Sequence, residues 1–218
     1  MYRTSAAAAA AFAALAGLVA AGATNGIDEW AVNHAMPGAR FTGGRSSLVD
    51  AAIPLHHVHW HGAVHIAAEL VTLPAAFLTA TILLALCCVR LGDRRAAALA
   101  AVYVIANAIE ELTKQTLTRP PLHHGHLHLA ALDSSYPSGH TIRAVLVAAG
   151  VSLAWPALRL PAGAWAACAT VMLEVGGFHV PSDIAGGLLL ATALLAGAAT
   201  SASPSAPSRA CRPSSPAR

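Results

Sequence analysis

Residues 137–158 read PSGHTIRAVLVAAGVSLAWPAL, a short polar turn that leads directly into a long apolar run. A membrane-spanning helix needs about 20 mainly apolar residues. The stretch therefore predicts a spanning helix over about 141–158, with His140 at its beginning. Ser138 and Gly139 precede it, and a helix N-terminus offers hydrogen bonds to an anion. We expect a polar site at this end of the helix.

The whole chain has the composition of an integral membrane protein. Of its 218 residues, 56% are hydrophobic and 11% are charged, and the mean hydropathy is +0.58. Soluble domains carry roughly 25% charged residues. The net charge of +3 is small and scattered, so the sequence gives no support to nucleic-acid binding. The four cysteines show no spacing typical of a zinc site or a disulfide framework.

Six windows of the sequence are apolar and long enough to cross a bilayer. They cover about 5–23, 70–89, 96–113, 141–158, 161–178 and 184–200. We therefore predict an all-α membrane bundle of about six helices in one domain over 1–200. The polar tail over 201–218 is predicted to be disordered and cytoplasmic. The first window is rich in alanine and follows Arg3, so it is either a spanning helix or a cleaved signal peptide.

Basic residues set the predicted orientation, because inner loops are enriched in lysine and arginine. With the amino terminus inside, the inner segments hold eight basic residues and the outer segments hold four. The clearest local signal is RLGDRR over 90–95, between the second and third windows. Both termini are then cytoplasmic, and His140 lies on the outer face.

A second histidine is predicted at the same face. His179 follows the window 161–178, and Asp183 precedes the window 184–200. A histidine can act as a nucleophile, a carboxylate can fix its tautomer, and another histidine can protonate a leaving oxygen. Three helix ends thus converge on groups suited to phosphoryl transfer.

The third window ends in polar residues that point to the same region. Asn107, Glu111 and Lys114 are predicted to share one helical face. Lys114 can neutralise phosphate oxygens as a point charge. The alternative is a snorkelling lysine at the membrane edge, paired with Glu110 at spacing i, i+4.

The order Lys114…Arg119-Pro120…Pro137-Ser138-Gly139-His140…His179-x-x-x-Asp183 resembles the type 2 phosphatidic acid phosphatase (PAP2) superfamily, which includes the vanadium haloperoxidases. The resemblance covers about residues 100–190, the predicted catalytic core. It implies that His179 attacks phosphorus, that Asp183 holds its ring, and that His140 protonates the leaving group.

The resemblance also implies a set of phosphate-binding groups and no metal or cofactor. These groups are Lys114, Arg119, the Ser138 hydroxyl and the Gly139 backbone amide. Arg143, about one helical turn past His140, is a further candidate.

Two departures from the family pattern leave fewer cationic groups for binding phosphate. Four residues, rather than the usual six, separate Lys114 from Arg119, and Pro121 stands where many bacterial members carry a second arginine. The family pattern has three motifs, which here are Lys114 to Pro120, Pro137 to His140, and a third that ends with His179 and Asp183. Met172 and Leu173 stand where this third motif usually begins with Ser-Arg. Arg143 either supplies the missing guanidinium or pairs with Glu174 in a buried ion pair.

The implied function is that of a phosphatase or phosphotransferase in a bacterial plasma membrane. Its substrate is expected to be a lipid phosphate or diphosphate at the outer leaflet, such as an isoprenoid diphosphate, phosphatidic acid or phosphatidylglycerol phosphate. The alternative is a catalytically diverged relative that binds lipid phosphate or a metal without turnover.

All 12 histidines fall on the predicted outer side. Two clusters stand out, and their members are His56, His57, His59, His61, His65 and then His123, His124, His126, His128. Such density is compatible with metal binding, with pH sensing or with contact to an anionic substrate.

Overall fold

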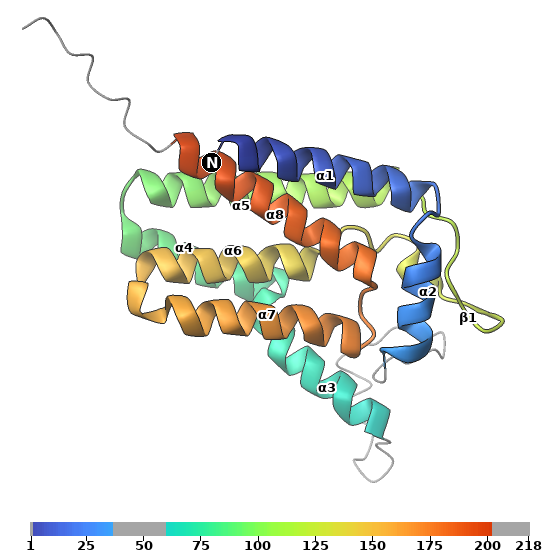
Figure 1. The fold of residues 1–218 in the computed structure, drawn as a ribbon. Helices are drawn as coiled ribbons and strands as arrows, with labels where there is room; N and C mark the ends of the chain where they lie inside the picture. Colours follow the sequence, from blue (N-terminus) through green and yellow to red (C-terminus); the bar gives the residue numbers. More distant parts are fainter. Residues whose placement is uncertain (1, 37–59, 202–218) are drawn as a thin grey trace, which may run out of the picture.

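Eight α-helices form the described part of the protein in a computed structural model, which describes residues 2–36 and 60–201 (Figure 1). They are α1 (Tyr2–Ala20), α2 (Asn25–His34), α3 (Trp60–Thr72), α4 (Phe77–Leu91), α5 (Arg94–Thr116), α6 (Gly139–Ala154), α7 (Arg159–Val175) and α8 (Pro181–Ser201). The strands β1 (His123–His124) and β2 (Leu127–His128) pair antiparallel. The predicted all-α class is confirmed. Of the tail predicted over 201–218, Ser201 is the last residue of α8, and residues 202–218 lie outside the described residues.

Within the described residues, five helical stretches are long and apolar enough to cross a membrane. They are Arg3–Ala20, Gly62–Leu91, Arg94–Thr116, Pro156–Val175 and Pro181–Thr200. The remaining predicted span, 141–158, corresponds to the shorter apolar helix α6, which has 16 residues. It ends at Ala154 rather than near 158 because Trp155 precedes Pro156, and a residue before proline is disfavoured in the helical region.

Hydropathy predicted one helix over the window 70–89, but the structure has two helices joined by a short turn there. α3 ends at Thr72, a 3₁₀ turn covers Leu73–Ala75, and α4 begins at Phe77. Pro74 lies in this turn, and Ala76 is extended with ψ 148°. Proline lacks a backbone N–H and clashes with the preceding turn, which breaks the helix at this point.

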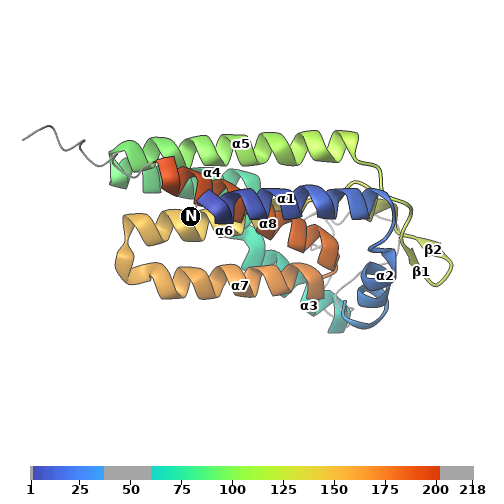
Figure 2. The ribbon, with the colours of Figure 1, turned by 45° about the horizontal axis from the view of Figure 1, so that its top comes forward.

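Helix α6 occupies the centre of the bundle and packs against α4, α5, α7 and α8 (Figures 1 and 2). Ile142 and Leu146 are fully buried in a core shared with Leu84 and Leu99. The outer helices instead present large apolar side chains outward, including Val89, which is 81% exposed. An apolar exterior of this kind suits contact with lipid.

One end of the bundle gathers the polar residues. The end of α5, the end of α7 and the starts of α6 and α8 all lie on the side that carries α2 and the β1–β2 hairpin (Figures 1 and 2). On that side α6 begins short of the ends of α5 and α7. Helix α1 runs beside α8, and the Ser5 hydroxyl donates to the Ala193 carbonyl at 2.8 Å.

Candidate active site

The loop between α7 and α8 positions His179. The N–H groups of Phe178 and His179 donate to the Leu173 carbonyl at 2.9 and 3.2 Å, which folds the chain back over the end of α7. Gly177 permits this turn, because its φ of 78° is a conformation that favours glycine. Pro181 then begins α8, so Asp183 falls in the first turn of that helix.

Asp183 holds the His179 ring from the start of α8. The carboxylate Oδ2 lies 3.4 Å from His179 Nδ1 and accepts hydrogen bonds from the Ser135 hydroxyl at 2.5 Å and the Val180 N–H at 3.4 Å. An acid in the first turn also interacts favourably with the helix dipole. A hydrogen bond from Nδ1 leaves Nε2 as the basic, nucleophilic nitrogen of the ring.

Ser138 and Gly139 form the beginning of α6. The Ser138 hydroxyl is the N-cap and accepts from the Thr141 N–H at 3.3 Å and the Thr141 hydroxyl at 3.0 Å. The Ser138 N–H donates to the Asp183 carbonyl at 3.0 Å, which joins the second and third motifs directly. Gly187 allows this approach, because a Cβ there would lie 2.7 Å from the Ser138 carbonyl.

The two histidines of the motifs face one another across this junction. The ring centroids of His140 and His179 are 6.3 Å apart, with an angle of 53° between the ring planes. His140 is half-buried and His179 is buried. The predicted convergence of His140, His179 and Asp183 is therefore present in the structure.

Arg119 has a different environment from the one predicted for it. Its Nη1 donates to Asp183 Oδ1 at 3.0 Å, and its Nη2 donates to Asp28 Oδ2 at 2.5 Å. The side chains of all three residues are fully buried. The guanidinium thus bridges two carboxylates, and the structure gives it these partners where a phosphate contact was expected.

Asp28 of α2 belongs to this site, although sequence reasoning missed it. Its Oδ1 accepts from the Ser182 N–H at 3.0 Å and its Oδ2 from the Ser182 hydroxyl at 2.7 Å. Asp28 thereby ties α2 to the first turn of α8, next to Asp183. Its only signal in the sequence is an acidic residue between two predicted spans, which normally indicates an exposed loop.

Glu110 also belongs to this site, although the sequence analysis considered it only as a partner of Lys114. Its Oε1 accepts from Lys114 Nζ at 2.6 Å, and its Oε2 accepts from Arg143 Nη1 at 2.8 Å. Arg143 also donates to the Asn107 side-chain oxygen and the Ala75 carbonyl. The pairing of Lys114 with Glu110, given above as the alternative to phosphate binding by Lys114, is present in the structure.

Two related predictions are wrong. Arg143 pairs with Glu110 and not with Glu174. The functional face of α5 contains Glu110 rather than Glu111, which is exposed and accepts from Gln115 at 2.7 Å. Positions 110 and 114 stand one helical turn apart and therefore lie on the same face of α5.

The Glu110 carboxylate also reaches the second motif. A Cβ added to Gly139 would overlap Glu110 Oε1, so the carboxylate lies directly against the first residue of α6. Among the described residues, the ion pairs of the site join three cations, Lys114, Arg119 and Arg143, to three carboxylates, Asp28, Glu110 and Asp183. The charges of these six groups balance one another.

Comparison with known proteins assigns this arrangement to a family. The model of the PAP2 superfamily matches residues 95–205, more than half of the chain. The chain belongs to the PAP2 superfamily. This matched region contains all of the residues predicted for the site, from Lys114 to Asp183.

A solved structure confirms the fold of this PAP2 protein. The protein is similar to the structure titled "Crystal structure of the first transmembrane PAP2 type phosphatidylglycerolphosphate phosphatase from Bacillus subtilis", with a TM-score of 0.59 and 18% sequence identity. The similarity covers 92% of this chain and 96% of the other. A search of curated proteins found no match. The protein therefore has the multi-pass architecture of a membrane phosphatase fold.

The tight contact at Gly139 leads to a test of this PAP2 site. Gly139→Ala is expected to lower the free energy of unfolding by about 1–3 kcal/mol, the usual effect of overpacking. The added methyl group must displace the Glu110 carboxylate and its two cationic partners. The measurement is thermal unfolding of both variants in detergent. Gly163→Ala is the matched control, because a Cβ there meets nothing within 4 Å; equal stability of the two variants would contradict the contact.

Of the predicted histidine clusters, the described member His65 lies against the loop that carries His179, where its ring stacks on Phe178 with the centroids 4.5 Å apart. His65 is buried, with Nδ1 2.8 Å from the Gly176 carbonyl. In the hairpin, the ring centroids of His123 and His128 are 5.7 Å apart. His123 contacts Glu29, and His128 contacts Asp133. Within residues 2–36 and 60–201, no group of three or more His, Cys, Asp or Glu is placed to hold a metal ion. The prediction for His56, His57 and His59 lies outside the described residues.

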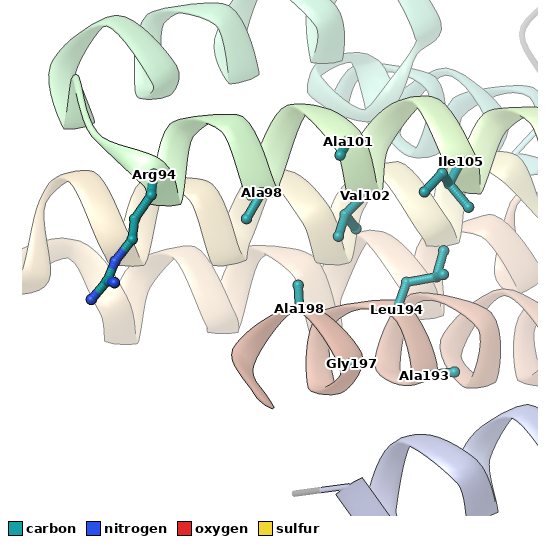
Figure 3. A pocket seen from close by; sticks show the side chains of 9 residues that line it. All are labelled: Arg94, Ala98, Ala101, Val102, Ile105, Ala193, Leu194, Gly197 and Ala198. Atoms are coloured by element: carbon teal, nitrogen blue, oxygen red, sulfur yellow. The ribbon is translucent and has the colours of Figure 1, made fainter. Parts of the chain in front are cut away.

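A groove of about 440 Å³ lies between α5 and α8 (Figure 3). Small residues such as Ala98, Ala101 and Ala198 line it, and Arg94 lies at its edge. This region is near the start of α5 and the end of α8, whereas the paired histidines lie near the opposite ends of these helices. The groove is therefore separate from the PAP2 motifs.

Proposed function

We propose that this protein is a membrane phosphatase that acts on a lipid phosphate or diphosphate through a phosphohistidine at His179. The observation that supports it best is the pairing of His179 with Asp183, with the His140 ring 6.3 Å from the His179 ring. A nucleophile, its orienting carboxylate and a second acid–base group are thus present within one cluster.

The proposed reaction has two steps. In the first, Nε2 of His179 attacks phosphorus, a P–N bond forms, and the P–O bond to the lipid breaks while protonated His140 gives its proton to the leaving oxygen. Asp183 stabilises the positive charge that develops on the ring of His179. In the second, His140 takes a proton from water, the water oxygen attacks phosphorus, and the P–N bond breaks. An alcohol in place of water gives phosphotransfer.

Several groups are proposed to hold the phosphoryl oxygens. Lys114 is the most accessible cation, with 27% of its side chain exposed, and Arg143 approaches from α6. The Gly139 N–H stands at a helix start, where backbone donors have no partner within the helix. The Ser138 hydroxyl contributes as the N-cap that fixes this turn. Arg119 is proposed to act through Asp183, which it holds at 3.0 Å.

The proposed location is a bacterial plasma membrane with the site on its outer face. Arg90, Arg94 and Arg95 lie around the turn between α4 and α5, at the bundle end away from the site. Enrichment of basic residues on the inner side supports this orientation. A site at the outer surface allows the tail of an amphiphilic substrate to stay in the lipid.

A second candidate function is binding of lipid phosphate without turnover. It is favoured by the Glu110 carboxylate, which already forms ion pairs with both Lys114 and Arg143. Met172 and Leu173 also lack the guanidinium expected in the third motif. The presence of His140, His179 and Asp183 in one cluster favours catalysis over this alternative.

The test is phosphate release from isoprenoid diphosphate, phosphatidic acid and phosphatidylglycerol phosphate in detergent micelles. The wild type is expected to release phosphate from at least one of them, and the double variant His140→Ala/His179→Ala from none. Equal rates for the two proteins, or no release from any lipid, would overturn the catalytic proposal. The pattern of rates also identifies the substrate class.

A further inference from the structure

We infer that the Glu110 carboxylate occupies the phosphoryl position of the proposed site and acts as an internal anion that a phosphate group must displace. This inference rests on the proposed function, because it assigns a ligand to the same cluster. It extends that function because Glu110, which lies outside the three motifs, would determine which phosphate groups the site binds.

The contacts of Glu110 are those expected of a bound phosphate. One carboxylate oxygen accepts from Lys114 at 2.6 Å, the other accepts from Arg143 at 2.8 Å, and the group lies against Gly139. Two of these three contacts are cations proposed to bind the substrate. The third is the start of α6 at Gly139, and the first N–H groups of a helix have no partner within the helix.

The burial of Glu110 makes this contact set exclusive. Its side chain is only 9% exposed, and that of Arg143 is also 9% exposed. A carboxylate and a phosphoryl group cannot both lie against Gly139, since a single added carbon there already overlaps the carboxylate. Binding of phosphate at this position therefore requires the Glu110 side chain to rotate away from α6.

The exchange of anions selects ligands by charge. The carboxylate brings one negative charge, whereas the phosphate of a monoester or a terminal diphosphate brings close to two at neutral pH. A dianion gains more from Lys114 and Arg143 than it loses by displacing Glu110. A phosphodiester carries one charge and gains no such advantage. Glu110 thus closes the site to the phosphodiester headgroups of ordinary membrane lipids.

The experiment compares Glu110→Gln with the matched control Glu111→Gln, which removes the same charge one residue away on the exposed face. The probes are inorganic phosphate and dimethyl phosphate, a monoanionic diester, each titrated calorimetrically into the purified full-length protein. Glu110→Gln is expected to lower the Kd for phosphate about tenfold, which corresponds to about 1.4 kcal/mol. It is also expected to give measurable binding of dimethyl phosphate, which the wild type excludes. Glu111→Gln is expected to match the wild type with both probes.

An unchanged or higher Kd for phosphate in Glu110→Gln would overturn the inference, and so would equal effects of the two variants. If Glu110→Gln does not fold, Glu110→Asp replaces it, because the shorter side chain draws the carboxylate back from Gly139 while keeping its charge. Its Kd for phosphate is then expected to fall about threefold, and no change would overturn the inference.

The result is separable from the test of catalysis. Tighter phosphate binding in Glu110→Gln without turnover of any lipid phosphate by the wild type would support the inference and contradict the proposed function. Turnover by the wild type together with unchanged binding in Glu110→Gln would do the reverse.

Discussion

Replacing His179 with alanine is expected to lower phosphate release from the best lipid substrate by at least about 10⁴-fold, the scale of effect seen when an enzyme loses its nucleophile. The alanine side chain cannot form the P–N bond. Water would have to attack phosphorus directly, without being held in place as Asp183 holds the His179 ring. The rate is measured as phosphate release at saturating lipid. Acid-labile ³²P carried by the wild-type protein after rapid alkaline quenching is expected to be absent from the variant.

Two further variants make this result specific. His34→Ala is the control, because His34 is exposed on α2 and its Nδ1 lies 2.9 Å from the Trp30 carbonyl of the same helix; its rate is expected to equal that of the wild type. His140→Ala is expected to slow release from an alkyl phosphate far more than from an aryl phosphate, whose leaving group needs no proton. Phosphoprotein of normal yield in His179→Ala would contradict the assignment of the nucleophile.

Replacing Arg119 with alanine is expected to have the largest effect on stability, about 3–5 kcal/mol, the usual consequence of leaving a buried charge without its partner. Arg119 is the cation that lies between Asp28 and Asp183, and both carboxylates are fully buried. Without it, the two negative charges lie near one another in a dry environment. Thermal unfolding of the protein in detergent measures the change.

The control for this variant is Arg159→Ala, because Arg159 is exposed at the start of α7. Arg119→Lys is expected to recover only part of the lost stability, since an ammonium group cannot match the planar fork that contacts both carboxylates. Stability of Arg119→Ala equal to that of Arg159→Ala would show that the bridge contributes nothing.

The sequence was sufficient to predict the bundle and the centre of the site. Apolar windows predicted the helices because a bilayer demands long apolar segments whatever their tertiary contacts. His140, His179 and Asp183 could be placed together because each lies at the end of a predicted span, and the spans alternate in direction. These predictions depend on local composition and on the order of elements, which a sequence states directly.

Other features depend on packing and were beyond that reasoning. The partner of Arg143 is Glu110 rather than Glu174, because the rotation of α5 and α7 about their own axes decides which acid faces α6. Asp28 is separated from Arg119 by 91 residues, and their contact follows only from the fold of α2 over the bundle end. The break at Pro74 was visible in the sequence, but averaging hydropathy over a window concealed it.

The bridge from Asp28 to Arg119 also bears on what counts as a unit in this protein. Similarity to the family begins at residue 95, whereas the carboxylate that completes the buried charge balance is supplied from residue 28. A fragment trimmed to residues 95–205 would keep every family motif and still lack one of the two anions that hold Arg119. The region that matches the family is therefore shorter than the region that contains all partners of Arg119 described above. Any excised or grafted version of the domain has to include α2.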